Sequence, residues 1–274
     1  MELWQLEATE LARLIRVGQA SSREAVAACL ARMDAVNDKL NAVVRRMDEE
    51  ALVAADAADA ARAQGNALGP LHGVPVTIKV NTDQKGHPTD NGVVAFRDLI
   101  APDDAPVVAN LRAAGAVVIG RTNVPAFSMQ AFSENDLHGR TLNPRNREVT
   151  PGGSSGGAGA AVAAGIGPIA QGNDIAGSVR FPAYCCGIVG LRVGLGAFPH
   201  LITQQKSPAS KSATLRKSSR RRTWWLIADS VMPRLSAESR KRPLDRGGME
   251  GAQRGEGRQG CLRLGHGPGS VSPA

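Results

Sequence analysis

Hydrophobic residues recur at helical spacing over much of the first third of the chain. Between residues 21 and 40 an apolar side chain falls every three or four positions, and the segment SSRE at residues 21–24 is typical of a helix capping box. The same period predicts a shorter helix over residues 6–15 and an alanine-rich helix over residues 48–63. A further helix is predicted over residues 103–114, because a glycine follows its last turn.

Two short apolar runs have the composition of buried β-strands. Residues 74–78 (VPVTI) follow a turn-forming segment, and residues 116–119 (AVVI) are apolar throughout, as in strands that are covered on both faces. The alternation of such strands with helices predicts an α/β fold in which a mixed β-sheet is flanked by helices. Residues 156–165 (GGAGAAVAAG) consist almost entirely of glycine and alanine, which predicts a closely packed small-residue helix.

The helical and strand patterns end near residue 200, and the charge pattern changes at the same place. Residues 201–274 contain 15 Lys and Arg against 5 Asp and Glu, a net charge of +10. Residues 1–200 contain 18 basic and 20 acidic residues, so the excess positive charge of the whole chain lies in the tail. We therefore predict a folded part, residues 1–200, and a basic, mostly disordered tail, residues 201–274, which is too poor in apolar residues to offset its ordering entropy.

Several classes of protein are disfavoured by what the chain lacks. No stretch approaches eighteen consecutive apolar residues, and no basic segment precedes an apolar run at the N-terminus, so neither a membrane span nor a secretory signal is expected. The four cysteines have no CxxC spacing, and the five histidines form no zinc-binding pair. These features predict a cytoplasmic protein that uses no metal and no cofactor.

Three short segments carry polar groups that can cooperate in nucleophilic catalysis: Lys79 after an expected strand, GGSSGG at residues 152–157, and DIAGSVR at residues 174–180. Each alone has a plain structural explanation, because a Gly/Ser run is usually a loop and a lysine at a strand end is usually solvated. The run also lacks the GK[ST] ending of a phosphate-binding loop. A serine hydroxyl needs a base to attack an amide carbonyl, and a lysine can serve when burial lowers its pKa from about 10.4.

In combination these segments resemble the amidase signature family. The resemblance is carried by TPGGSSGG at residues 150–157 and GNDIAGSVRFPA at residues 172–183, with GVP at residues 73–75 and GRTN at residues 120–123 as upstream elements. It covers the chain from about residue 20 to residue 198. The fold that it implies is the amidase signature fold, which is the mixed sheet with flanking helices already predicted.

The resemblance also implies a role for each of three residues. Ser178 would be the nucleophile, Lys79 the base, and Ser154, held after a cis peptide bond, would relay the proton between them. Ser155 is the rival to Ser154 as the relay, although a structural role is preferred for it. The oxyanion hole would be formed by the backbone N–H groups of one turn, those of Ile175, Ala176, Gly177 and Ser178. Asp174 and Arg180 are expected to lock this turn rather than to touch the substrate.

The chain departs from the family pattern at several positions. Asn173 stands where the family usually has Thr or Ser, and Ala176 stands where it has Gly, although alanine disfavours a positive φ. Val80 replaces the Asp that commonly follows the lysine. After residue 192 the family pattern is only partly followed, so we expect an incomplete amidase signature fold and a truncated or frame-disrupted gene product.

The activity implied by the resemblance is hydrolysis of a carboxylic amide to an acid and ammonia or an amine through a Ser178 acyl-enzyme, with weak activity if the fold is incomplete. An alternative within the family is the amidase-like subunit of a tRNA-dependent amidotransferase. A third hypothesis is an inactive fragment whose basic clusters, at residues 220–222 and 240–242, bind nucleic acid. No nucleic-acid-binding motif supports it, and a solvated tail is favoured.

The expected partner is a small-molecule amide, and an exposed sheet edge would allow self-association into a homo-oligomer. Two interpretations of Phe127, Met129 and Phe132 stay open at this point. These side chains can line an acyl pocket, or they can belong to the core.

Overall fold

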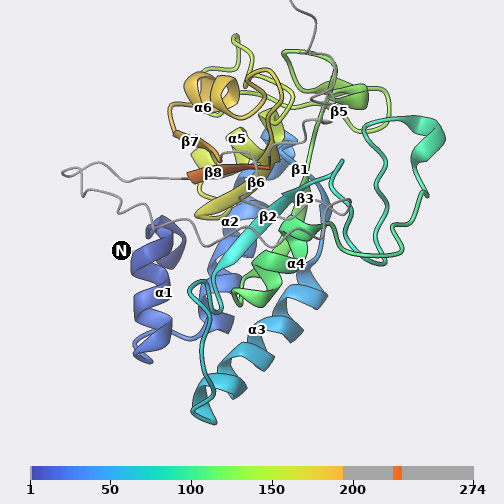
Figure 1. Ribbon diagram of the computed structural model, residues 1–274. Coiled ribbons are helices and arrows are strands. Elements are labelled where there is room, and N and C mark those ends of the chain that lie inside the picture. Colours follow the sequence, from blue (N-terminus) through green and yellow to red (C-terminus); the bar gives the residue numbers. More distant parts are fainter. Residues whose placement is uncertain (1, 194–224, 230–274) are drawn as a thin grey trace, which may run out of the picture. The chain divides into compact units, whose positions relative to one another are not determined.

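The computed structural model describes residues 2–193 and the strand formed by residues 225–229 (Figure 1). Its helices are η1 (Leu3–Gln5), α1 (Ala8–Arg16), α2 (Ser22–Leu40), α3 (Asp48–Ala63), η2 (Val94–Phe96), α4 (Pro106–Ala113), η3 (Ala126–Ser128), α5 (Gly156–Ala164) and α6 (Arg180–Cys186). Its strands are β1 (Val43–Arg46), β2 (Pro75–Lys79), β3 (Val117–Thr122), β4 (Glu134–Asn135), β5 (Gly139–Arg140), β6 (Ile169–Asn173), β7 (Val189–Arg192) and β8 (Trp225–Asp229).

Six of these strands form one mixed sheet in the order β1-β3-β2-β6-β8-β7. Strand β1 is antiparallel to β3, and all the other neighbouring pairs are parallel. The predicted α/β fold, with a mixed sheet flanked by helices, is therefore confirmed. The parallel strands β2 and β6 end at the same edge of the sheet, which is where the loops of α/β proteins most often build a site.

The N-terminal helices begin and end where local signals predict. The Ser21 hydroxyl accepts a hydrogen bond from the Glu24 N–H (3.0 Å), and the Glu24 carboxylate accepts one from the Ser21 N–H (2.8 Å), which completes the capping box before α2. Helix α2 ends at Leu40 because Asn41 takes the left-handed conformation that stops a helix. Helix α4 begins at Pro106, three residues later than predicted, because proline is favoured at the first helical position.

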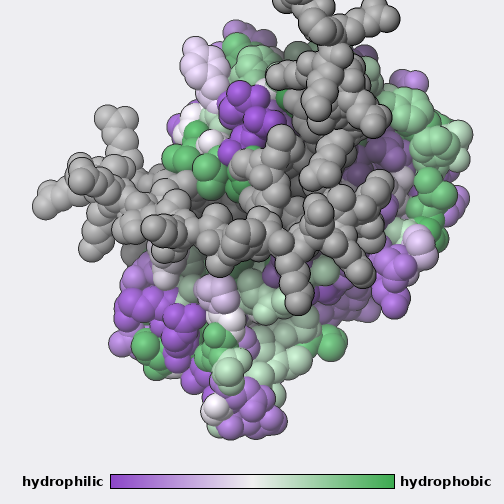
Figure 2. All heavy atoms as spheres, viewed as in Figure 1, coloured by the Kyte–Doolittle hydropathy of each residue, from purple (hydrophilic) through white to green (hydrophobic). Residues whose placement is uncertain are grey.

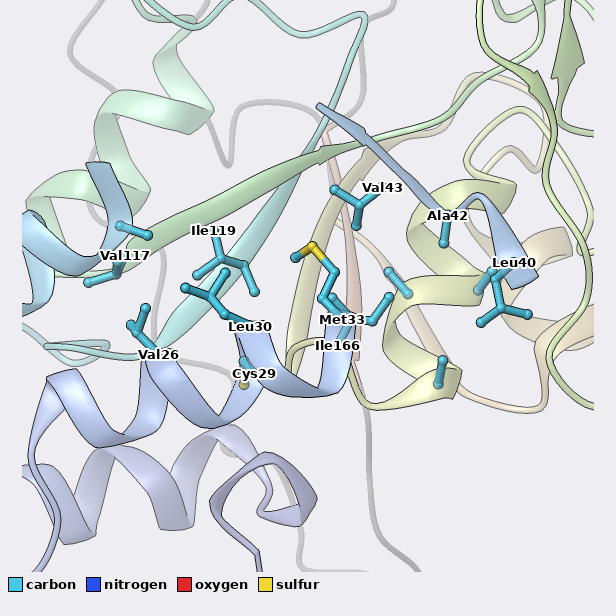
Figure 3. Packing of buried hydrophobic residues seen from close by; sticks show 14 of the residues in the cluster. Val26, Cys29, Leu30, Met33, Leu40, Ala42, Val43, Val117, Ile119 and Ile166 are labelled. Atoms are coloured by element: carbon cyan, nitrogen blue, oxygen red, sulfur yellow. The ribbon is translucent and has the colours of Figure 1, made fainter. Parts of the chain in front are cut away.

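Alternate residues of the central strand β3 pack on opposite faces of the sheet. Val117 and Ile119 join the core beneath α2, α3 and α5, whereas Val118 packs with Val107 and Val108 of α4 on the other face. Figure 3 shows Met33 and Leu30 of α2 pointing toward Ile119. Figure 2 shows one face of the outer surface, on which hydrophobic and hydrophilic residues of the described part of the chain are interspersed.

This core gives a direct test of the packing. Replacing Ile119, which has no exposed surface, with alanine is expected to lower the free energy of unfolding by about 2–5 kcal/mol, because it removes buried methylene groups and leaves a cavity. Replacing the exposed Val53 with alanine is the matched control and should change stability by less than about 0.5 kcal/mol. Urea unfolding of both variants measures the difference, and equal midpoints would contradict this core.

Strand β8 lies within the tail for which disorder was predicted. Trp225–Asp229 pairs in parallel with β6 on one side and with β7 on the other, so the tail that we predict to be mostly disordered contains five residues of regular structure. The short apolar run WLIA was masked by the polar composition of the 74-residue tail around it. The rest of the tail, residues 201–224 and 230–274, lies outside the described residues, and so do both basic clusters.

In the part of the chain that the structure describes, no helix combines the length and the apolar character needed to span a membrane.

Candidate active site

Lys79 is the last residue of β2 and has no exposed surface. Its ammonium group, Nζ, lies 2.7 Å from the Ser154 hydroxyl and 2.7 Å from the side-chain oxygen of Asn173, and donates to both. Burial lowers the pKa of Lys79 from 10.5 to about 7, although the negative charge of Asp174 acts in the opposite direction. A lysine in this state can accept a proton near neutral pH, unlike a solvated lysine.

The Gly153–Ser154 peptide bond is cis, as the resemblance implied. Ser154 lies just before α5 and is 1% exposed. A side chain on Gly153 would come within 2.5 Å of the Gln130 carbonyl oxygen, and Gly152 has a φ of +84°, so this approach to Ser154 requires glycine at both positions. The small residues of the segment thus allow the backbone to present the Ser154 hydroxyl to Lys79.

Ser155 has different partners from Ser154. Its hydroxyl donates to the Asn173 carbonyl oxygen (3.4 Å), and its N–H donates to the Ser178 carbonyl oxygen (3.1 Å). These contacts join the Gly/Ser segment to the turn that carries Ser178. The geometry therefore favours Ser154 over Ser155 as the serine next to the lysine, although the roles themselves stay predictions.

Ser178 lies on the turn between β6 and α6 and is partly exposed. No hydrogen bond joins its hydroxyl to Ser154 or to any other of the described residues. The fold therefore brings Lys79 and Ser154 into direct contact and places Ser178 on the adjoining turn. Its role as the nucleophile stays a prediction.

The turn that carries Ser178 is built around the buried carboxylate of Asp174. This carboxylate accepts the N–H groups of Gly177 (2.7 Å), Val179 (3.1 Å) and Arg180 (3.2 Å), and it forms an ion pair with the Arg180 guanidinium (2.9 Å). Burial alone would raise the pKa of Asp174, but the Arg180 guanidinium and the three N–H groups outweigh it and hold the pKa well below its usual range. Asp174 and Arg180 are thus placed to lock the turn.

The four N–H groups predicted for the oxyanion hole are not equivalent in this structure. Among the described residues, the N–H groups of Ile175, Ala176 and Ser178 have no hydrogen-bond partner, whereas the Gly177 N–H is engaged by Asp174. The Gly177 N–H would have to break its hydrogen bond to the Asp174 carboxylate before it could donate to a substrate oxyanion. Ala176 does not have a positive φ, so the alanine that replaces the family's glycine fits its backbone without strain.

Phe127, Met129 and Phe132 are exposed, by 56%, 82% and 46%, so they do not belong to the core. The backbone of residues 130–132 lies against Gly153, next to Ser154. These apolar side chains therefore belong to a loop that passes close to the site. Of the two interpretations left open by the sequence, an acyl pocket or the core, this position favours the acyl pocket.

Sequence reasoning missed two side chains of the site. Asn173 was noted only as a departure from the family pattern, and Asn81 was not singled out, yet the two amides bond to each other beside Lys79. The spacing Lys79-Val80-Asn81 was the available signal, because Asn81 lies two residues after the lysine that ends the strand, in a turn. Within the same described part of the chain, no three His, Cys, Asp or Glu residues are grouped to hold a metal ion.

Comparison with known proteins gives consistent matches. The family model described as Amidase matches residues 24–214. The chain is 49% identical over 253 residues to the indoleacetamide hydrolase of Bradyrhizobium diazoefficiens, covering 85% of this chain and 48% of that protein. It is 44% identical to a glutamyl-tRNA(Gln) amidotransferase subunit of Moorella thermoacetica, covering 74% of this chain and 44% of that subunit.

A solved structure of 6-aminohexanoate cyclic dimer hydrolase matches with a TM-score of 0.62 and 38% identity, over 69% of this chain and 38% of that one. This chain thus spans about half the length of the curated relatives that it matches.

Proposed function

The chain belongs to the amidase signature family, and from this premise we propose that it hydrolyses a carboxylic amide to an acid and ammonia or an amine. The observation that carries the proposal is the buried Lys79, whose Nζ lies 2.7 Å from the Ser154 hydroxyl and whose pKa is lowered to about 7. Such a pair is placed to remove a proton from a serine nucleophile at neutral pH.

In the proposed reaction the Ser178 hydroxyl attacks the amide carbonyl carbon. Its proton passes to Ser154 as the Ser154 proton passes to the neutral amine of Lys79. The N–H groups of Ile175, Ala176 and Ser178 are free to donate to the oxygen on which negative charge develops. When the C–N bond breaks, the proton held by Lys79 returns through Ser154 to the leaving nitrogen. Water then hydrolyses the acyl-enzyme by the same relay.

The acyl group of the substrate is proposed to be apolar and aromatic. Two observations support this: the exposed apolar side chains of Phe127, Met129 and Phe132 lie on the loop that passes Ser154, and the relative from Bradyrhizobium diazoefficiens is an indoleacetamide hydrolase. An aromatic acyl group would bury its ring against these side chains.

A second candidate function is release of ammonia from glutamine as the amidase-like component of an amidotransferase, which the 44% identity to an amidotransferase subunit supports. It uses the same three residues but a polar acyl group. The apolar loop beside Ser154 favours the first candidate.

The test is ammonia release by the full chain from indoleacetamide, phenylacetamide, acetamide and glutamine at equal concentration. Faster hydrolysis of the two aromatic amides is expected, by about tenfold or more over acetamide, because burial of a ring contributes about 1.5–3 kcal/mol. A preference for glutamine would favour the second candidate. No turnover of any amide, with no labelling of Ser178 by a fluorophosphonate, would overturn the proposal.

A further inference from the structure

The side-chain amides of Asn173 and Asn81 form a directed chain of hydrogen bonds that ends on Lys79. The Asn173 oxygen accepts from Lys79 Nζ (2.7 Å), and the Asn173 nitrogen donates to the Asn81 oxygen (2.9 Å). The Asn81 nitrogen in turn donates to the Ser128 hydroxyl (2.9 Å). This chain ties the carboxyl ends of β2 and β6 to the η3 turn, three segments that lie far apart in the sequence.

From this geometry we infer that Asn173 is a positioning residue for Lys79, which holds the lysine nitrogen so that its lone pair is left for the Ser154 hydroxyl. The inference rests on the proposed function in one respect, namely that Lys79 acts as the base. It concerns a side chain at which this protein departs from its family, where Thr or Ser is usual.

The reason lies in which groups can donate. The oxygen of a side-chain amide accepts hydrogen bonds and cannot donate one, so Asn173 binds an N–H of Lys79 and never competes for its lone pair. A Thr or Ser hydroxyl at the same place can also donate, and can therefore occupy the lone pair. When the amine is neutral, the Ser154 hydroxyl is then the donor that remains within 2.7 Å of Nζ.

Asn81 fixes which end of the Asn173 amide faces the lysine. The Asn81 oxygen accepts a hydrogen bond from the Asn173 nitrogen. Rotating the Asn173 amide by half a turn would break that bond and place an N–H of Asn173 against the ammonium group of Lys79. Asn81 is oriented by its own donation to Ser128, whose φ of +59° belongs to the left-handed region. The orientation is thus determined by three consistent hydrogen bonds rather than by one.

The charged surroundings of Lys79 are sparse, so the contribution of Asn173 can be observed. Among the described residues, Asp174 is the charged group that acts on Lys79, and it favours the charged form. The neighbouring β6 and α5 carry no charged side chain. Arg121 of the adjacent β3 is buried and donates instead to the carbonyl groups of Pro88, Val80 and Thr82.

The test is a direct titration of Lys79 in the full chain, which needs no turnover. The chain has seven lysines, and labelling them with carbon-13 at Cε lets NMR follow each one with pH. The Lys79 signal is the one that Lys79→Met removes. Asn173→Ala should lower the pKa of Lys79 by about one pH unit, since the charged form loses an acceptor. Asn173→Asp should raise it by about one unit or more, since a negative charge favours the charged form.

A Lys79 pKa that falls in Asn173→Ala and rises in Asn173→Asp indicates that residue 173 acts directly on Lys79. If Asn173 had only a structural role, the two substitutions would shift the Lys79 pKa in the same direction or not at all. Asn66→Asp adds the same charge at an exposed position and should leave the Lys79 titration unchanged. Asn173→Thr is the conservative variant. It keeps an acceptor oxygen for the charged lysine, but its hydroxyl can also donate to the neutral amine, so the pKa of Lys79 should lie between those of the parent and of Asn173→Ala.

Rates of Ser178 labelling by a fluorophosphonate between pH 5 and 9 complete the test, a range of about two units on either side of the Lys79 pKa of about 7. The acidic limb should move to lower pH in Asn173→Ala and to higher pH in Asn173→Asp. Unshifted Lys79 titrations in both variants, with native circular dichroism, would overturn the inference. Shifted titrations without any labelling would instead overturn the proposed function and leave the role of Asn173 standing.

Discussion

Replacing Ser178 with alanine is expected to lower amide hydrolysis by about a thousandfold or more and to abolish covalent labelling by a fluorophosphonate. The hydroxyl is the group that forms the acyl-enzyme, so its removal leaves only the binding groups and the backbone N–H donors. Its side chain makes no hydrogen bond to another described residue, so its loss should not disturb the fold. Stopped assays of ammonia release and mass spectrometry of the labelled chain measure the two effects.

Ser155→Ala is the matched control for this variant. It removes a neighbouring hydroxyl whose contact, at 3.4 Å to the Asn173 carbonyl oxygen, is long, and it leaves the Ser155 N–H bond to the Ser178 carbonyl intact. Substantial labelling should therefore remain. Labelling that persisted in Ser178→Ala, or that vanished only in Ser155→Ala, would show that the nucleophile is another residue.

Replacing Lys79 with methionine is expected to reduce hydrolysis by about a hundredfold or more, the usual contribution of a general base. In the parent chain the rate should rise with pH through about 7, because the base is the neutral amine and burial has lowered its pKa to that value. The variant should lose this rise. A parent rate that is constant from pH 5 to 9 would argue against a titrating lysine.

Loss of activity in Lys79→Met should not be loss of the fold. The pKa of Lys79 is about 7 when folded and about 10.4 in an unfolded chain, so between these values the unfolded chain binds more protons and stability rises with pH. Methionine removes this burial cost. The variant should therefore unfold at an equal or higher urea concentration than the parent at pH 7, and the gap should narrow as pH rises toward 10. A lower midpoint at pH 7 would contradict the assignment of a buried, destabilising charge.

Elements with a local signal were predictable from the sequence. The capping box before α2 lies within four consecutive residues, and the strands β2 and β3 are apolar runs that need no partner to be recognised. The segments that contain Lys79, Ser154 and Ser178 are also short and local, but it is the resemblance to the amidase signature family that implies a role for each of these three residues.

Elements that depend on distant partners were not predictable in this way. Strand β6 contains Gln171, a buried polar residue whose side-chain oxygen accepts the Lys79 N–H (3.1 Å), so its sequence lacks a strand pattern. Strand β8 pairs with β6 more than fifty residues away, Trp225 opposite Ile169. Parallel strands are joined by long connections, so neither their pairing nor their position in a sheet is encoded in neighbouring residues.

The chemistry of the site shows the same division. The sequence alone determined which residue types are present, the family, and the 75-residue separation of Lys79 from Ser154. Only the tertiary structure decided that the Ser154 hydroxyl lies 2.7 Å from the lysine nitrogen, that the Gly177 N–H is engaged by Asp174, and that Asn173 turns its oxygen toward Nζ. The reason is physical: burial lowers a pKa and a hydrogen bond orients an amide only where distant segments come together, and no short stretch of sequence contains that information.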